Sequence, residues 1–363
     1  MKRALILSDL HIGTGHTKGR PNVMDDFRED RRFAQLLSRS STGAHADTET
    51  TLVLNGDIFD LLKVPVNGDF PEAITERIAQ QKLGECLAGH PHVIEAFRGF
   101  LSRPQNRLIY QPGNHDMELF FPGVQKLFCR AITGDDTHPQ IRFAADEPSF
   151  ELEGGIQIHH GHQFEALHAM DFKKLILTHG PRAPVLNLPW GSLFILQVLN
   201  RLMRERPYLD KVMPFWPLLV GGVFFDTRFT LKLLGTSAFY FGRARLNPLW
   251  WEKRPFEKLT KFLRTEIKVF ADLNSYARKI LKSPRLNAVF MGHTHGEMVR
   301  MHENEKYYIN TGTWMPMVNL NLTSLGQNSA LHYGLVTYDT DRRPHVSLQR
   351  WRGRRAVTEE VSF

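Results

Sequence analysis

Residues 4–11 read ALILSDLH, a short apolar run followed at once by a cluster with Ser, Asp and His. An apolar run of this length, bounded by polar residues, is typical of a buried β-strand. The same pattern returns four times along the chain, and the clusters that follow are rich in Asp, Asn, His and Gly. The four segments are TLVLNGDIFD at 51–60, LIYQPGNHD at 108–116, IQIHHGH at 156–162 and AVFMGHTH at 288–295.

Helix-like stretches separate several of these strands, for example residues 26–38 and 74–100. Strands joined by helices predict an α/β fold. Ligands collect at the carboxyl ends of strands in such sheets, so we expect the polar clusters to meet in one site. Three further strand-like runs, at 306–310, 333–338 and 345–351, are expected to complete a second sheet.

The charge and the cysteine content narrow the class of protein. The formal net charge is +8 at pH 7, which allows an anionic partner. The two cysteines, Cys86 and Cys129, fit no metal-binding spacing, which argues against a disulfide framework and suits a reducing compartment. Lys2 and Arg3 give a basic start, but the apolar run at 4–7 is too short for a signal peptide. We therefore expect a cytoplasmic protein.

Residues 181–285 interrupt the pattern, because they contain no such cluster and are rich in Phe, Trp, Leu and Arg. They hold 19 Lys and Arg against 7 Asp and Glu, a net of +12, so the rest of the chain sums to −4. Their longest uncharged apolar run, 212–225, has 14 residues, whereas a membrane-spanning helix needs about 20. We predict a catalytic domain made of 1–180 and 286–363, with a helical insertion at 181–285.

The clusters have the chemistry of a two-metal site. Two adjacent divalent cations need hard or borderline ligands and at least one carboxylate that bridges them. Carboxylate, imidazole and amide oxygen meet this need, and the clusters supply all three without a thiolate. His293 and His295 are two residues apart, so in an extended chain their side chains point the same way and can each serve one ion.

In this order, the motifs resemble those of the calcineurin-like metallophosphoesterase superfamily, from Asp9 to about Trp314 outside the insertion. The resemblance implies two stacked mixed β-sheets flanked by helices. It also implies a hydrolase of phosphoester or pyrophosphate bonds, a phosphatase or phosphodiesterase, in which a hydroxide bridging two metal ions attacks phosphorus. Mn2+ is the metal we expect, and Fe, Zn, Co and Mg stay open.

The resemblance also assigns roles to single residues. Asp57 is expected to bridge the two ions. His115 is expected to be the non-ligand histidine that neutralises phosphoryl charge and protonates the leaving group. Asp116 is expected to fix the tautomer of His115 and favour its charged form. The first ion would be held by Asp9, His11 and His295, and the second by Asn114, His160 and His293.

In the fourth cluster, the metal ligand could be His159, His160 or His162. The His-Gly pair of the family follows a strand, which favours His160. His162 is then expected either beside the substrate phosphate or in a structural loop role. For Asp60 we expect a structural role.

The insertion has two interpretations. A helical cap would pack its Leu and Phe side chains on the catalytic core, because apolar residues at helical spacing are usually core. A lid would receive acyl chains, or rest on an anionic membrane surface and place the protein peripherally at the inner face of the membrane. Aromatic and basic side chains both suit such an interface, and the insertion interleaves basic residues with Trp190, Trp216, Trp250 and Trp251.

One relative in the superfamily, the UDP-2,3-diacylglucosamine pyrophosphohydrolase of the lipid A pathway, also carries a helical lid. Its third motif resembles Gly-Asn-Arg-Asp, whereas this chain has Gly-Asn-His-Asp at 113–116, so that lipid pyrophosphate hydrolysis stays an alternative. A nuclease or cyclic-nucleotide phosphodiesterase is another. The basic residues of the insertion are mixed with large apolar residues, which disfavours a nucleic-acid partner. We infer no protein partner, and a scaffold without catalysis is disfavoured because no motif ligand is missing.

Overall fold

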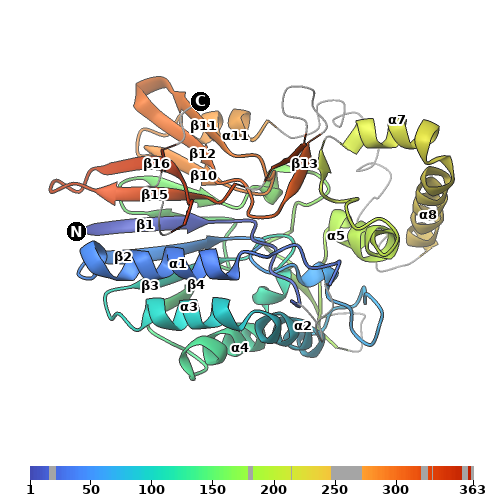
Figure 1. The fold of residues 1–363 in the computed structure, drawn as a ribbon, viewed down its shortest axis with the longest axis horizontal. Coiled ribbons are helices and arrows are strands. Elements are labelled where there is room, and N and C mark those ends of the chain that lie inside the picture. Colours follow the sequence, from blue (N-terminus) through green and yellow to red (C-terminus); the bar gives the residue numbers. More distant parts are fainter. Residues whose placement is uncertain are drawn as a thin grey trace.

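Two β-sheets lie face to face at the centre of the computed structural model (Figure 1). The structure describes residues 1–15, 22–178, 183–213, 215–246, 272–319, 326–328, 330–353 and 359–360. Within these residues the first sheet has seven strands, in the order β17-β16-β15-β1-β2-β3-β4. They span Lys2–Leu7 (β1), Glu49–Asn55 (β2), Arg107–Gln111 (β3), Ile141–Phe143 (β4), His332–Tyr338 (β15), Pro344–Arg350 (β16) and Glu359–Glu360 (β17).

Strands β1 to β4 run parallel, and β15 and β16 extend the sheet antiparallel beyond β1. The second sheet has the order β11-β12-β10-β6-β5, in which β12, β10 and β6 run parallel. Its strands span Ser149–Leu152 (β5), Ile156–His159 (β6), Ala288–Met291 (β10), Met298–His302 (β11) and Lys306–Asn310 (β12). Short strands elsewhere are Ile176–Leu177 (β7), Val185–Leu186 (β8), Val212–Met213 (β9), Met317–Asn319 (β13) and Gly326–Asn328 (β14).

The predicted fold class, two stacked mixed sheets flanked by helices, is confirmed. The expectation that all three late strands complete the second sheet is wrong for two of them. Only β12 lies there, whereas β15 and β16 lie in the first sheet. The reason is that β1 is buried on both faces: Ala4 and Ile6 pack between the sheets, and Leu5 and Leu7 pack toward the helices. Such a strand belongs inside a sheet and pairs on both sides, with β2 and β15.

Helices α1 to α4 cover the outer face of the first sheet (Figure 1). Phe33, Phe97 and Phe128 from three of these helices meet edge to face, with ring centroids 5.2 and 5.9 Å apart. The stretch predicted at 74–100 forms two helices, because Pro91 starts a new helix and restricts His90 before it to a non-helical backbone. The helices span Asp30–Ser41 (α1), Glu76–Gly89 (α2), Pro91–Leu101 (α3) and Pro122–Thr133 (α4).

The predicted insertion contains two kinds of packing. Helix α5 (Trp190–Phe194), a π-helical turn (Ile195–Leu199) and α6 (Asn200–Met203) form one helical run whose apolar side chains join the main core. Helices α7 (Phe215–Phe225) and α8 (Thr227–Leu246) follow one another at a steep angle and form a helix pair at the right of Figure 1, away from the sheets. Helix α11 (Leu273–Ile280) packs on β10 and β12 of the second sheet.

One of the four tryptophans of the insertion lies in the core. Trp190 is buried in the main core and so does not lie at an interface. Trp250 and Trp251 lie outside the described residues, as does the side chain of Trp216. Among the described residues, no helix is both long and apolar enough to cross a membrane.

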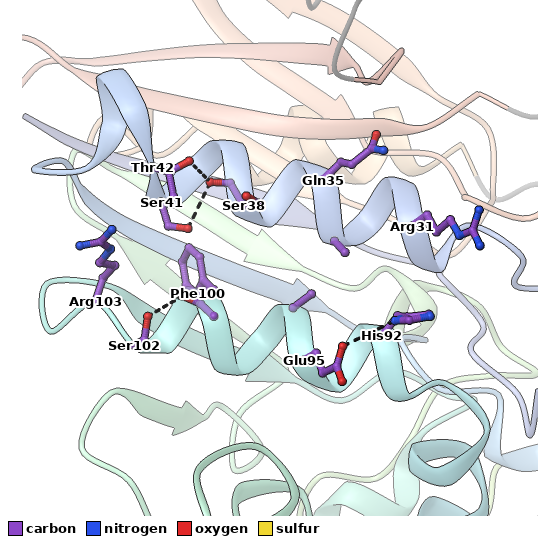
Figure 2. Close-up of a pocket in the computed structure, with 13 residues that line it drawn as sticks. Arg31, Gln35, Ser38, Ser41, Thr42, His92, Glu95, Phe100, Ser102 and Arg103 are labelled. Atoms are coloured by element: carbon purple, nitrogen blue, oxygen red, sulfur yellow. Dashed lines mark hydrogen bonds and ion pairs between the residues drawn. The ribbon is translucent and has the colours of Figure 1, made fainter.

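A surface cavity of about 550 Å³ lies between α1 and α3 (Figure 2). Its rim carries Arg31, Gln35, His92 and Glu95, with Phe100 at one end. None of the residues in the polar clusters lines it. The polar clusters therefore lie away from this cavity.

Candidate metal centre

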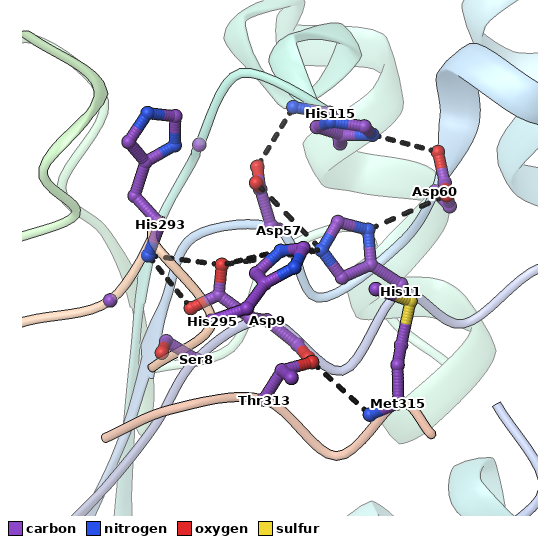
Figure 3. Close-up of polar contacts among 12 residues, drawn as sticks. Ser8, Asp9, His11, Asp57, Asp60, His115, His293, His295, Thr313 and Met315 are labelled. Carbon is purple, nitrogen blue, oxygen red and sulfur yellow. Dashed lines mark hydrogen bonds and ion pairs between the residues drawn. The ribbon is translucent and has the colours of Figure 1, made fainter. Parts of the chain in front are cut away.

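The polar clusters meet beyond the carboxyl ends of five strands, where both sheets end. Figure 3 shows Asp9, His11, Asp57 and His295 pointing toward one another, although they come from three distant parts of the chain. The predicted ligands are Asp9 and His11 after β1, Asp57 after β2, Asn114 after β3, His160 after β6, and His293 and His295 after β10.

Asp9, His11 and His295 form one group whose ligand atoms lie within 4.8 Å of one another. Oδ1 of Asp9 is 3.6 Å from Nε2 of His295 and 4.0 Å from Nε2 of His11. The two imidazole Nε2 atoms are 3.0 Å apart. The carboxylate of Asp9 is fully buried, so three electron-rich groups converge where little water can reach them.

Asp57, His160 and His293 form a second group of the same kind. Nδ1 of His160 lies 2.8 Å from the backbone carbonyl oxygen of Asn55. Because a carbonyl only accepts, Nδ1 donates this hydrogen bond, and Nε2 is the ring atom left to bind an ion once it has lost its proton. That Nε2 lies 3.1 Å from Oδ2 of Asp57, and burial of both groups calls for a cation beside them. Burial lowers the pKa of His160, but the charge of Asp57 outweighs it and raises the pKa to about 10.

Asn114 lies beside the second group through its neighbours. The backbone N–H of His115 donates to Oδ1 of Asp57 at 2.8 Å, which places the loop after β3 against the loop after β2. Oδ1 of Asn114 is buried and has no hydrogen-bond partner among the described residues. A buried amide oxygen without a partner is costly and fits a ligand of a bound ion.

His115 lies beside the two groups and joins neither of the two ligand triads given above. Its Nδ1 is 2.9 Å from Oδ1 of Asp60, and its side chain is 16% exposed. Burial lowers the pKa of His115, but the carboxylates of Asp60 and Asp57 outweigh burial and raise the pKa to about 9. His115, Asp60 and His11 also form a third group of possible ligands.

The prediction that Asp116 fixes the tautomer of His115 is wrong, because Asp60 occupies that position. Asp116 instead accepts hydrogen bonds from the backbone N–H groups of Ile58 and Gly113, at 2.8 and 2.5 Å. It also accepts one from the hydroxyl of Tyr110 at 2.7 Å. Asp116 therefore joins the loops after β2 and β3, and the structural role expected for Asp60 falls to Asp116.

The other two histidines of the fourth cluster belong to neither ligand group, although the ring of His162 lies 5.3 Å from that of His160. Nδ1 of His159 lies 3.0 Å from the side-chain amide of Gln163, outside the ligand groups. His162 is fully buried and stacks on Phe172, and its two ring nitrogens have no hydrogen-bond partner among the described residues. Burial holds the pKa of His162 well below its ordinary value, so its ring is neutral.

Two residues that the sequence did not single out lie at the second group. Oε2 of Glu165 is 2.9 Å from Nε2 of His293, so this carboxylate holds the His293 ring and leaves Nδ1 for other partners. The ring of His168 lies 5.3 Å from that of His293, and its Nδ1 is 3.4 Å from Nδ2 of Asn114. Both follow the fourth cluster within a few residues, and no spacing rule marks them.

The backbone of the site is strained at the ligand positions. Nine non-glycine residues have positive φ in the described chain. Such conformations are rare and cost of order 1 kcal/mol or more each, and they cluster at functional sites. Five of the nine belong to the predicted ligand set, namely Asp9, His11, Asp57, His293 and His295.

No protein-family model matches the sequence, and no curated protein sequence matches it. Solved structures with a similar fold include a dimetal phosphatase from Danio rerio, with 11% identity over 99% of this chain and 98% of that chain (TM-score 0.39). A zinc-complexed Vps29 from Entamoeba histolytica has 10% identity over 99% and 98% (TM-score 0.32). A 5'-nucleotidase precursor from Thermus thermophilus has 11% identity over 96% and 54% (TM-score 0.33). At identities and TM-scores this low, the similarity carries no information about the function of this chain.

Proposed function

We propose that this chain hydrolyses a phosphoester or pyrophosphate bond with two divalent metal ions. The position of Asp57 carries the proposal. Its Oδ2 lies 3.1 Å from Nε2 of His160 and 4.0 Å from Nε2 of His11. One carboxylate oxygen is thus close to both ligand groups, which is the arrangement that a bridging ligand needs.

The donor set supports two ions of borderline hardness. Carboxylate and amide oxygens suit Mn2+ and Mg2+, and imidazoles suit Zn and Fe, so the mixed set favours Mn2+ as the metal. Bound ions would supply Lewis acidity and an activated water near neutral pH. The first ion would take Asp9, His11 and His295, the second Asn114, His160 and His293, and Asp57 would serve both.

His115 would act on the substrate and not as a ligand. With Nδ1 held by Asp60, its Nε2 is left to face a phosphoryl oxygen. The partly exposed ring can be reached by a substrate. A protonated imidazole there neutralises charge that grows on the phosphoryl oxygens and passes its proton to the leaving group.

The experiment pairs metal analysis with a substrate panel. The protein is loaded with Mn2+, its metal content is measured, and hydrolysis of a chromogenic monoester, a chromogenic diester and a UDP-linked lipid is compared. We expect two ions per chain and turnover of at least one substrate. Asp57→Asn should lose the two-ion complex and nearly all turnover, whereas Asp136→Asn, an exposed matched control, should keep both. No hydrolysis by the wild type, or two ions and full activity in Asp57→Asn, would contradict the proposal.

A second proposal concerns the α7–α8 helix pair, which we propose rests on an anionic membrane surface. Phe224 and Phe225 at the end of α7 are 76% and 93% exposed. On α8, Leu231, Leu234 and Phe239 are 64%, 52% and 73% exposed and lie at helical spacing. Apolar side chains this exposed are typical of interaction sites. The exposed Arg228 on the same helix would meet anionic head groups and contribute about 1 kcal/mol, whereas Lys232 beside it pairs with Glu205.

Vesicle co-sedimentation tests the membrane proposal. The protein is mixed with anionic or with neutral phospholipid vesicles, at low and high salt. We expect binding to anionic vesicles at low salt and release at high salt. Phe225→Ser should weaken binding, whereas Met301→Ser, which removes a 65% exposed side chain from β11, should not. Equal binding by the two variants, or none by the wild type, would contradict the α7–α8 helix pair as a membrane contact.

A further inference from the structure

A buried network of charges lies behind Asp60. Nζ of Lys63 is 3.1 Å from Oδ2 of Asp60 and 2.6 Å from Oδ2 of Asp26, and it forms a further ion pair with Asp210. Lys211 completes the network by pairing with Asp26. Asp210 and Lys211 belong to the insertion, whereas Asp60 belongs to the loop after β2. The network therefore joins the insertion to the metal centre.

Because the network is buried, each of its charges must be paired. The side chains of Lys63, Asp26 and Asp60 are 4%, 1% and 2% exposed, and that of Asp210 is 18% exposed. A buried charge is costly unless it is paired, so each carboxylate holds the ammonium in place and the ammonium holds each carboxylate. The three carboxylates around Lys63 leave its ammonium little freedom to turn away from Asp60.

Asp60 connects the buried charges to the metal centre. Its Oδ2 faces Lys63 and lies 3.4 Å from Nδ1 of His11. Its Oδ1 accepts the hydrogen bond from Nδ1 of His115 at 2.9 Å. The direction of the carboxylate is thus fixed from one side by Lys63, and it fixes the His115 ring on the other.

We propose that Lys63 and Asp210 are positioning residues, through which the insertion sets the orientation of His115. This inference rests on the proposed function, because it assigns His115 to the reaction. The insertion is then part of the catalytic arrangement and more than a cover. A movement of the segment that carries Asp210 would then change turnover through Asp60 and His115.

Asp210→Asn tests the inference, because the partly exposed side chain tolerates loss of its charge better than Lys63 would. We expect two bound ions, an unchanged KM for a small chromogenic ester, and a kcat reduced by about tenfold, as is common for residues that orient an active-site group. Asp226→Asn is the matched control, since Asp226 is an insertion carboxylate paired with Arg206 away from Asp60. Its kcat should stay within about twofold of the wild type, in the range expected for an exposed ion pair.

A double-mutant cycle with His115→Ala gives the decisive readout. If Asp210 acts through His115, the Asp210→Asn substitution should have no further effect on kcat once the imidazole is absent. A merely structural role would lower the melting temperature and leave the two effects on kcat multiplicative. Wild-type kcat in Asp210→Asn, or a full tenfold effect in the His115→Ala background, would overturn the inference. A wild type that hydrolyses nothing would instead overturn the proposed function.

Discussion

Asp60 and His115 are joined by a hydrogen bond of 2.9 Å between Oδ1 and Nδ1, although they follow different strands of the first sheet. The pair turns a carboxylate after β2 into the partner of an imidazole after β3. It holds Nδ1 of the histidine that would act on substrate, while Oδ2 of Asp60 lies 3.4 Å from the predicted ligand His11. Substitutions should therefore distinguish Asp60 from Asp116, which follows His115 directly in the sequence.

His115→Ala should keep both metal ions and lose about a hundredfold or more in turnover, because it removes a proton donor and a charge-neutralising group. Asp60→Asn should lower turnover in the same direction and by a smaller factor, since the ring stays and its anchor weakens. Metal content and steady-state kinetics measure both effects. Loss of an ion in His115→Ala would mean that His115 is a ligand.

Asp116→Asn should act on stability. The carboxylate accepts three hydrogen bonds, and the amide that replaces it has one oxygen to accept them. Leaving a buried donor unpaired costs about 1–3 kcal/mol. We expect a lower midpoint in thermal or urea unfolding, with kcat at low temperature changed far less than in Asp60→Asn. The reverse pattern would restore Asp116 as the partner of His115.

Gly113→Ala should damage the site for a steric reason. A Cβ on Gly113 would overlap the side chain and backbone of Asp57, neither of which can move without displacing the carboxylate. We expect weaker metal binding and lower turnover, measured by metal titration. Gly84→Ala in α2 is the matched control, because nothing lies near its Cβ position, and in a helix the change should stabilise by about 0.5–1 kcal/mol. A Gly113→Ala variant with full metal affinity would contradict this packing.

His90 should make stability depend on pH. Its Nδ1 lies 2.8 Å from Asp30 and its Nε2 lies 2.9 Å from Asp25, so both nitrogens face carboxylates. Burial lowers the pKa of His90, but these hydrogen bonds outweigh burial and raise the pKa to about 9. A pKa raised on folding stabilises fully below the unfolded value of about 6.5, and the stabilisation is lost as pH rises through 9.

The contribution of His90 is on the order of 3 kcal/mol, from the shift between the two pKa values. Unfolding free energies measured between pH 6.5 and 9.5 should therefore fall more steeply for the wild type than for His90→Gln. The substitution keeps a side chain that can donate a hydrogen bond and removes the titration. Parallel slopes for the two proteins would show that His90 does not titrate in this range.

Much of the fold and of the site follows from local pattern. An apolar run and the polar cluster after it are adjacent in sequence, so the strand ends that carry Asp9, Asp57 and Asn114 could be predicted without knowing which strands pair. Parallel strands then bring their carboxyl ends to one edge. The break before Pro91 also has a local cause, because the residue before a proline avoids the helical backbone conformation.

The remainder depends on contacts between distant segments. Asp60 and Asp116 both suit a partner for His115, and only the packing of two loops decides between them. Glu165, Asp26 and Asp210 carry no spacing signal, because they act through residues far away in sequence. The placement of β15 beside β1 likewise depends on pairing over hundreds of residues, and β16 follows by pairing with β15.

The position of β1 between β2 and β15 has a consequence for folding kinetics. One edge of β1 can pair early with residues 49–55, whereas the other must wait for residues 332–338. Contacts this remote in sequence slow folding, and an unpaired strand edge favours association with other chains. The refolding yield from denaturant should therefore fall as protein concentration rises. A yield independent of concentration would show that this edge is protected before β15 arrives.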